Sequence, residues 1–247
     1  MNIRLNKILA MLLFVSGSAL ALQGESVSYQ VNGQKYEGYY ISPTKDAPLI
    51  LMVHDWDGLT DYEVKRAEML VKEGYAVFAV DLFGAGIRPT KVEDRRQHTG
   101  ELYKDRQKMR DLLNGGLKAA EAKGAQIDDV VAMGYCFGGA AVLELARSGA
   151  DMKGFVTFHG GLKTPQDQNY SKTKGSVLVM HGAADQAISM EDFTALSKAL
   201  EASQVSNEMI VYSGAPHAFT VFGSPNYREE ADHKSWHRFL AYLNELK

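Results

Sequence analysis

Features that identify several common protein classes are scarce in this sequence. Its 27 basic and 30 acidic residues are interspersed and leave a net charge of −3, so no basic stripe offers the phosphate contacts that nucleic-acid binding requires. Gly84 and Gly86 are too sparse for a dinucleotide fingerprint, so we expect no nicotinamide cofactor. His233 and His237 have metal-ligand spacing, but we interpret them as part of a solvated helix face. We therefore expect no nucleic acid, cofactor or metal.

The first 21 residues have the three parts of a secretory signal. Arg4 and Lys7 form a short basic region, residues 8–15 are apolar, and residues 19–21 give the small-x-small pattern that signal peptidase accepts. A membrane anchor is the alternative, but the apolar run is less than half of the roughly 20 residues that a spanning helix needs. We therefore expect cleavage after Ala21 and a periplasmic or secreted protein without a stable membrane anchor.

Cysteine occurs only once, as Cys136. An exported protein meets an oxidising compartment, in which cysteines usually occur in even numbers as disulfides. A lone thiol there is open to oxidation, so its presence indicates either deep burial or a use.

The distribution of apolar residues predicts an α/β fold. From Leu49 onward, apolar runs of strand length alternate with amphipathic segments of helix length, which is typical of a mostly parallel sheet with helices on both faces. Residues 26–42 contain two alternating runs around Asn32-Gly33, which predict an antiparallel hairpin at the N-terminal end of the domain. We expect residues 22–247 to form one domain. The expected parallel strands cover residues 49–54, 76–82, 129–134, 154–160, 176–182 and 208–214.

Helices are expected between these strands because apolar residues recur at spacings of three and four. The segment 84–100 is polar and carries turn residues, so we expect it to be a loop that crosses the strand ends. The expected helices cover residues 61–73, 101–123, 137–148, 190–203 and 227–246.

Cys136 lies where the strand 129–134 gives way to the helix 137–148, between Gly134 and Gly138. A nucleophile on a sharp strand-to-helix turn crowds any Cβ two residues away, and glycines relieve that clash. The N-terminus of the helix favours thiolate over thiol. The alternative is a buried structural cysteine, because free cysteine is among the most buried residue types.

Two downstream residues complete a catalytic pattern. Asp185 follows an apolar strand in a turn of small residues, and His217 lies in a loop after the next strand. An ordinary turn aspartate and an ordinary loop histidine are the alternatives. The order Cys136, Asp185, His217 is nevertheless that of nucleophile, acid and histidine in α/β-hydrolases, which favours a triad.

The residues around these positions resemble the dienelactone hydrolase family, a branch of the α/β-hydrolase fold that uses Cys-Asp-His. The segments "GYCFGG" (134–139), "HGAADQ" (181–186) and "PHAF" (216–219) are similar to its three signatures. "MVHDWDGL" and "GYAVFAVDLFG" are similar to its first strands, so the resemblance extends from about Leu49 to the C-terminus.

This resemblance implies hydrolysis of a small-molecule ester or lactone through a thioacyl-enzyme. The thiolate of Cys136 attacks the carbonyl, His217 transfers the proton and Asp185 orients the imidazole. The backbone N–H groups of Phe137 and Trp56 are expected to bind the oxyanion.

The sequence departs from the family at two positions. Asp55 takes the place of a glutamate that contacts the resting thiol in the family, and it is one methylene shorter. Val221 replaces an arginine that holds a substrate carboxylate. We therefore expect a preference for neutral esters or lactones, unless another arginine takes over the carboxylate. The arginines considered for this role are Arg88, Arg95, Arg106 and Arg228.

Other functions remain open at this point. A peptidase or a thioesterase shares acyl-transfer chemistry, because the pocket selects the scissile bond. A non-catalytic thiol-sensing or binding protein on the same fold is a further alternative, and the Asp55 substitution is its best support. We expect the mature protein to be a monomer.

Overall fold

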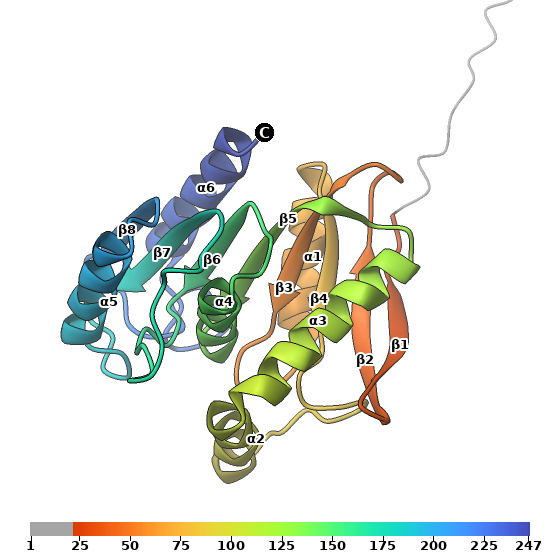
Figure 1. Ribbon diagram of the computed structural model, residues 1–247, viewed down its shortest axis with the longest axis horizontal. Coiled ribbons are helices and arrows are strands. Elements are labelled where there is room, and N and C mark those ends of the chain that lie inside the picture. The colour runs from red at the N-terminus through yellow and green to blue at the C-terminus, as the bar shows by residue number, and fades with distance from the viewer. Residues whose placement is uncertain (1–21) are drawn as a thin grey trace, which may run out of the picture.

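A computed structural model describes residues 22–247, so the predicted signal segment lies outside the described residues. Eight strands form one sheet in the order β1-β2-β4-β3-β5-β6-β7-β8 (Figure 1). No helix among the described residues is long and apolar enough to cross a membrane. The strands are β1 (Glu25–Val31), β2 (Gln34–Ile41), β3 (Pro48–Val53), β4 (Ala76–Val80), β5 (Gln126–Tyr135), β6 (Gly154–Phe158), β7 (Ser176–Gly182) and β8 (Asn207–Tyr212). The helices are α1 (Asp61–Lys72), α2 (Val92–Lys104), α3 (Arg106–Ala122), α4 (Phe137–Ser148), α5 (Met190–Ala202) and α6 (Glu229–Glu245).

The strand pairing confirms the predicted fold class. Strands β1 and β2 form an antiparallel hairpin, and β2 also pairs antiparallel with β4. The hairpin turns at Asn32 and Gly33, which have φ values of 49° and 79°, as a two-residue turn between twisted strands requires. All pairs from β4 through β3, β5, β6 and β7 to β8 are parallel. Their carboxyl ends therefore lie along one edge of the sheet.

Helices cover both faces of the sheet. Helices α3, α4 and α5 pack on one face through buried residues such as Leu113, Leu143 and Leu196. Helices α1 and α6 pack on the other face, where Leu70 and Phe239 are fully buried. Figure 1 shows α3 and α4 in front of the sheet and α1 behind it.

Two expectations about the segment between β4 and β5 were wrong. Residues 92–100, expected within a loop, form the first part of α2, and the single helix expected over 101–123 is divided between α2 and α3. Helix α2 buries only Thr99 and Leu102, so it lacks the apolar spacing that identifies a helix in a sequence. Asp105 divides the two helices because its carboxylate accepts a hydrogen bond from the Lys108 N–H at 2.9 Å and caps α3.

A buried ion pair joins the two helices on the second face. Arg66 of α1 lies 2.5 Å from a carboxylate oxygen of Asp232 of α6, and both side chains are almost fully buried. Arg66 also donates a hydrogen bond to the carbonyl oxygen of Thr220 at 2.7 Å. The loop after β8 is thereby linked to both helices.

We expect Asp232→Ala to lower the free energy of unfolding by about 3–5 kcal/mol, because it leaves the Arg66 charge buried without a partner. Urea denaturation followed by circular dichroism measures this change. Glu230→Ala on the same helix is the control, since Glu230 pairs with Lys234 at the surface and should contribute about 1 kcal/mol or less. Equal, small losses for the two variants would contradict the prediction.

Candidate active site

Cys136 occupies a strained turn between β5 and α4. Its backbone has φ 50° and ψ −112°, a conformation that costs a residue with a side chain about 1–3 kcal/mol. A Cβ on Gly134 would lie 2.3 Å from the backbone of Gly138, and a Cβ on Gly138 would lie 2.3 Å from the Val53 carbonyl oxygen. Both positions therefore require glycine. This is the steric reason for the Gly-x-Cys-x-Gly pattern.

The turn is held by its neighbours at the carboxyl edge of the sheet. The Cys136 N–H donates to the carbonyl oxygen of Phe158 at 3.1 Å, and the Gly161 N–H donates to the Cys136 carbonyl oxygen at 3.2 Å. These bonds fix the peptide groups on both sides of the Cys136 side chain. The sulfur then lies 3.0 Å from Nε2 of His217.

Asp185 holds the other side of the His217 ring. Its Oδ2 lies 2.8 Å from Nδ1 of His217, and its side chain is fully buried. Its Oδ1 accepts the backbone N–H groups of Ala187 and Ile188 at 2.8 and 2.9 Å. One carboxylate oxygen therefore fixes the acid within its own turn, and the other orients the imidazole. The structure thus places Cys136, His217 and Asp185 in one line of hydrogen bonds.

The acceptors on either side of His217 favour its charged form. Burial alone would lower the pKa of His217, but the hydrogen bonds with Asp185 and Cys136 and their negative charges outweigh it and raise the pKa to about 10. Burial would raise the pKa of Asp185, but the hydrogen bond and charge of His217 hold it below its ordinary value. The imidazole is therefore well placed to accept a proton from the thiol.

Cys136 and His217 line a cavity of about 230 Å³. Its wall is mainly apolar and aromatic, which is typical of small-molecule sites. The other lining residues include Trp56, Tyr103, Phe137 and Ile188.

Two backbone N–H groups are available at this cavity. Phe137 is the first residue of α4, so its N–H has no acceptor within the helix. The Trp56 N–H has no hydrogen-bond partner among residues 22–247. Both residues line the cavity beside Cys136, which is compatible with the expected role of their N–H groups. That role stays a prediction.

His54, to which sequence analysis assigned no role, fixes the direction of one of these groups. Its Nε2 accepts the Leu82 N–H at 3.1 Å, so its Nδ1 carries the proton and donates to the Asp55 carbonyl oxygen at 2.6 Å. In a trans peptide the C=O and N–H point in opposite directions, so this bond directs the Trp56 N–H away from His54. The only signal in the sequence was the position of His54 at the end of a strand, next to Asp55.

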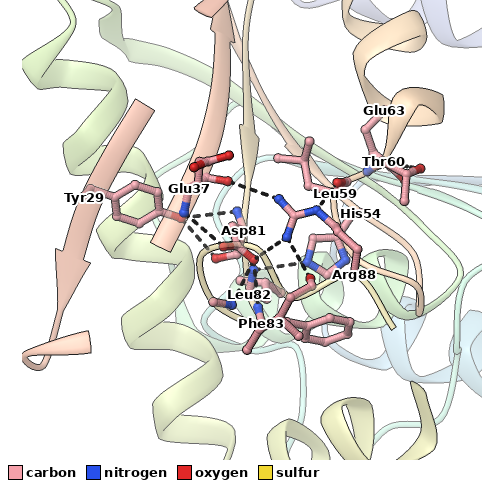
Figure 2. A network of polar contacts seen from close by, with 12 residues as sticks. Tyr29, Glu37, His54, Leu59, Thr60, Glu63, Asp81, Leu82, Phe83 and Arg88 are labelled. Carbon is pink, nitrogen blue, oxygen red and sulfur yellow. Dashed lines mark hydrogen bonds and ion pairs between the residues drawn. The ribbon is translucent and has the colours of Figure 1, made fainter. Parts of the chain in front are cut away.

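The loop that carries Trp56 is also held by a polar network centred on Asp81 (Figure 2). The carboxylate of Asp81 accepts the N–H groups of Phe83 and Gly84 at 3.0 and 3.1 Å and lies 3.7 Å from Arg88. Arg88 donates to the Leu59 carbonyl oxygen. Arg88 therefore connects the loop after β3, through Leu59, to the end of β4, through Asp81.

Asp55 does not hydrogen-bond the sulfur in the described part of the chain. It is largely buried, and its Oδ1 accepts the Asp57 N–H at 3.0 Å. Burial, together with Asp57, Glu63 and Cys136 nearby, raises the pKa of Asp55 well above its ordinary value. The contact with the resting thiol that the family resemblance implies stays a prediction.

Two more histidines lie near His217 without joining its hydrogen bonds. His159 is buried, with Nε2 2.8 Å from the Thr220 hydroxyl, and its ring centroid lies 5.3 Å from that of His217. His181 stacks on Phe193. No group of three or more His, Cys, Asp or Glu residues within residues 22–247 is placed to hold a metal ion.

Known proteins resemble the chain over most of its length. The model of the dienelactone hydrolase family matches residues 36–247. A Saccharolobus solfataricus protein named "Putative carboxymethylenebutenolidase" is 23% identical, over 90% of this chain and 98% of its own length. The crystal structure of a dienelactone hydrolase-like promiscuous phosphotriesterase from metagenomic libraries has a TM-score of 0.84 and 28% identity, covering 92% of this chain and 99% of its own.

A peptidase shares the fold more distantly. The Pyrococcus horikoshii acylaminoacyl peptidase has a TM-score of 0.71 at 15% identity, covering 92% of this chain and 42% of that chain. This likeness concerns the fold alone.

We expect Asp185→Asn to lower the pKa of His217, because it removes the negative acceptor at Nδ1. NMR titration of the His217 ring measures the change, with Asp167→Asn, an exposed acid, as the control. The raised folded-state pKa stabilises the fold fully below the ordinary value of 6.5, and this contribution is lost as pH rises through about 10. The destabilisation caused by Asp185→Asn should therefore shrink over that range. An unchanged His217 titration would contradict the assignment.

Proposed function

This chain belongs to the dienelactone hydrolase family and is an ester or lactone hydrolase of the α/β-hydrolase fold, and we propose that it works through a Cys136, His217 and Asp185 triad. The line of hydrogen bonds from Sγ through the imidazole to the Asp185 carboxylate, open to a cavity at the sulfur, is the observation that carries this proposal. This arrangement supports the proposed role of each group.

The proposed reaction has two steps of acyl transfer. His217 takes the thiol proton, the thiolate attacks the carbonyl carbon, and the N–H groups of Trp56 and Phe137 bind the oxyanion. The intermediate collapses to a thioester on Cys136 while His217 protonates the leaving alkoxide. Water, deprotonated by His217, then attacks the thioester and releases the acid and the thiol. Asp185 holds the ring in one orientation throughout.

Two alternatives make different predictions. A thiol-sensing or binding protein on this fold would have a reactive thiol without turnover. A peptidase or a thioesterase would use the same groups but would require a pocket that prefers amides or thioesters. The absence of a Cys136–Asp55 hydrogen bond among the described residues favours neither alternative, because His217 already provides a proton acceptor for the thiol.

We expect the purified protein to hydrolyse p-nitrophenyl butyrate and Cys136→Ala to lower kcat/KM by about 10³-fold or more, since the nucleophile is lost. Because Cys136 is the only cysteine, a thioester can form only there. Mass spectrometry of acid-quenched protein should show the butyryl adduct, and hydroxylamine should remove it.

The control is circular dichroism of Cys136→Ala, which should match that of the wild type. Alkylation of Cys136 by iodoacetamide without hydrolysis of any ester, amide or thioester would support the sensor instead. Faster hydrolysis of a matched amide or thioester than of the ester would support the other enzymes.

We also propose that the protein is exported. The basic, apolar and small-residue parts of residues 1–21 support this proposal. N-terminal sequencing of the protein from the periplasm or the medium should begin at Leu22. A mature protein that retains Met1 would contradict it, and substitution of Ala19 and Ala21 by bulky residues should block the cleavage.

A further inference from the structure

A second histidine packs directly against the ring of His217. His159 lies edge-to-face with it, with 5.3 Å between the ring centroids, and is fully buried. The rings of Tyr135 and Phe219 lie on its other sides, at centroid distances of 6.0 and 5.4 Å. His159 follows β6 and has φ 41°, a left-handed conformation that is uncommon for a residue with a side chain. Such strain is concentrated at functional sites, so the position of this ring calls for a functional explanation.

One buried hydroxyl holds the His159 ring. Oγ1 of Thr220 lies 2.8 Å from Nε2 of His159 and 2.6 Å from the Tyr62 hydroxyl. Arg66 donates from Nε to the Tyr62 hydroxyl at 3.3 Å and from Nη2 to the Thr220 carbonyl oxygen at 2.7 Å. The hydroxyl and the carbonyl group of Thr220 are therefore both bound, and Thr220 connects His159 to the arginine that joins α1 to α6.

The direction of this chain of hydrogen bonds follows from Arg66, which can only donate. Because the Tyr62 hydroxyl accepts from Arg66, its own proton is free to go to Thr220. The Thr220 hydroxyl then donates to Nε2 of His159, and the proton of His159 lies on Nδ1, which has no partner among the described residues. The opposite direction would leave both the Tyr62 proton and the Nδ1 lone pair unused, which costs more.

His159 stays uncharged beside His217. Burial and the nearby charges of His217 and Arg66 hold the pKa of His159 well below its ordinary value. The pKa of His217 is instead raised to about 10, so the two rings do not compete for one positive charge. The imidazolium is therefore confined to His217, where Asp185 and Cys136 lie next to its two nitrogens.

The backbone beside His217 is also strained and needs support on both sides. Ala218 has φ 61°, which is unfavourable for a residue with a Cβ. Before it, Asn226 donates to the His217 carbonyl oxygen at 3.0 Å. After it, Thr220 is fixed by the bonds described above. The bond from Thr220 to His159 differs from the Asn226 bond because it holds a side chain that packs against the imidazole itself.

We propose that His159, which accepts the Thr220 hydroxyl proton, is a positioning residue that keeps the imidazole of His217 directed at Cys136. The inference rests on the proposed hydrolase function. Asp185 holds one nitrogen of the ring but leaves rotation about that hydrogen bond free, and the edge-to-face contact with His159 restrains the plane of the ring. Neither His159 nor Thr220 is among the described residues that line the cavity at Cys136, so the pair acts on proton transfer and not on substrate binding.

The first test uses variants of Thr220 in the hydrolysis of p-nitrophenyl butyrate. Thr220→Val keeps the shape of the side chain without its hydroxyl and should lower kcat about tenfold or more, since small displacements of reacting groups have effects of this size. KM should stay within about twofold of the wild-type value, and Thr220→Ser should restore most of kcat. The control is Ser235→Ala, because Ser235 is another buried hydroxyl residue whose bond goes to the Asp232 carbonyl oxygen.

Variants of His159 separate the ring from its hydrogen bond. His159→Phe keeps a ring against His217 but cannot accept from Thr220, so its kcat should lie between those of the wild type and of His159→Ala. Circular dichroism shows whether each variant is folded. If His159→Ala does not fold, the comparison of Thr220→Val with Thr220→Ser still decides. Losses of kcat that are equal in Thr220→Val and Ser235→Ala, or no loss in Thr220→Val, would overturn the proposal.

Two measurements without turnover keep this result distinct from the proposed chemistry. Nitrogen NMR of labelled histidine should show His159 neutral and protonated on Nδ1, and a proton on Nε2 would overturn the proposal. Alkylation of Cys136 by iodoacetamide should slow about tenfold in Thr220→Val and stay unchanged in Ser235→Ala. This pattern without hydrolysis of any ester by the wild type would support the positioning role and contradict the hydrolase function. Hydrolysis by the wild type with unchanged kcat and alkylation in Thr220→Val would support the function and contradict the positioning role.

Discussion

The chemistry of this site depends on how closely helix α4 approaches the end of strand β3. The Cα of Gly138 lies so near the carbonyl oxygens of Val53 and His54 that a Cβ there would come within 2.3 and 2.5 Å of them. This contact places the N-terminus of α4, with the Phe137 N–H, beside the loop that carries Trp56. Cys136, two residues before Gly138, has a backbone conformation that residues with side chains rarely adopt. One close approach therefore brings both candidate oxyanion donors to the cavity that Cys136 lines.

The loop after β3 is held at both ends, which keeps the Trp56 N–H in one direction. His54 binds the loop at its start, through the Asp55 carbonyl oxygen. At its end, Glu63 accepts both the N–H and the hydroxyl of Thr60 in a capping box, at 2.8 and 2.9 Å. Burial raises the pKa of Glu63 to about 7 although these hydrogen bonds oppose the shift. A preorganised donor of this kind requires no rearrangement when negative charge develops on a substrate oxygen.

The sequence predicted the parts of this molecule that follow from local rules. Apolar runs marked the strands, Asn32-Gly33 marked the hairpin, and the glycines beside Cys136 marked a strained turn. Cys136 and His217, which lie in hydrogen-bond contact, are 81 residues apart in the sequence. Only the chain order of Cys136, Asp185 and His217, which is that of α/β-hydrolase triads, indicated that these residues come together. The first part of α2 was missed because this helix buries only two side chains. A helix with so narrow an apolar face has no periodic signal in the sequence.

A second cavity, of about 290 Å³, adjoins the one at Cys136 and shares Tyr103 and Ile188 with it. The same missed boundary explains why the sequence did not predict this cavity. The break at Asp105 ends α2 just after Tyr103 and starts α3 at Arg106, so the guanidinium lies over the Tyr103 ring at the wall between the two cavities. If α2 and α3 formed one continuous helix, Tyr103 and Arg106 would also lie on one helix face, because they are three residues apart. The direction of that face would then be set by α3 alone. The direction of α2 instead depends on a cap and on packing across the strand ends. The residues of the proposed triad lie beyond the ends of buried strands and follow the fold, whereas connections such as α2 vary more between relatives. Family resemblance therefore predicts the reaction of this chain more closely than its substrate.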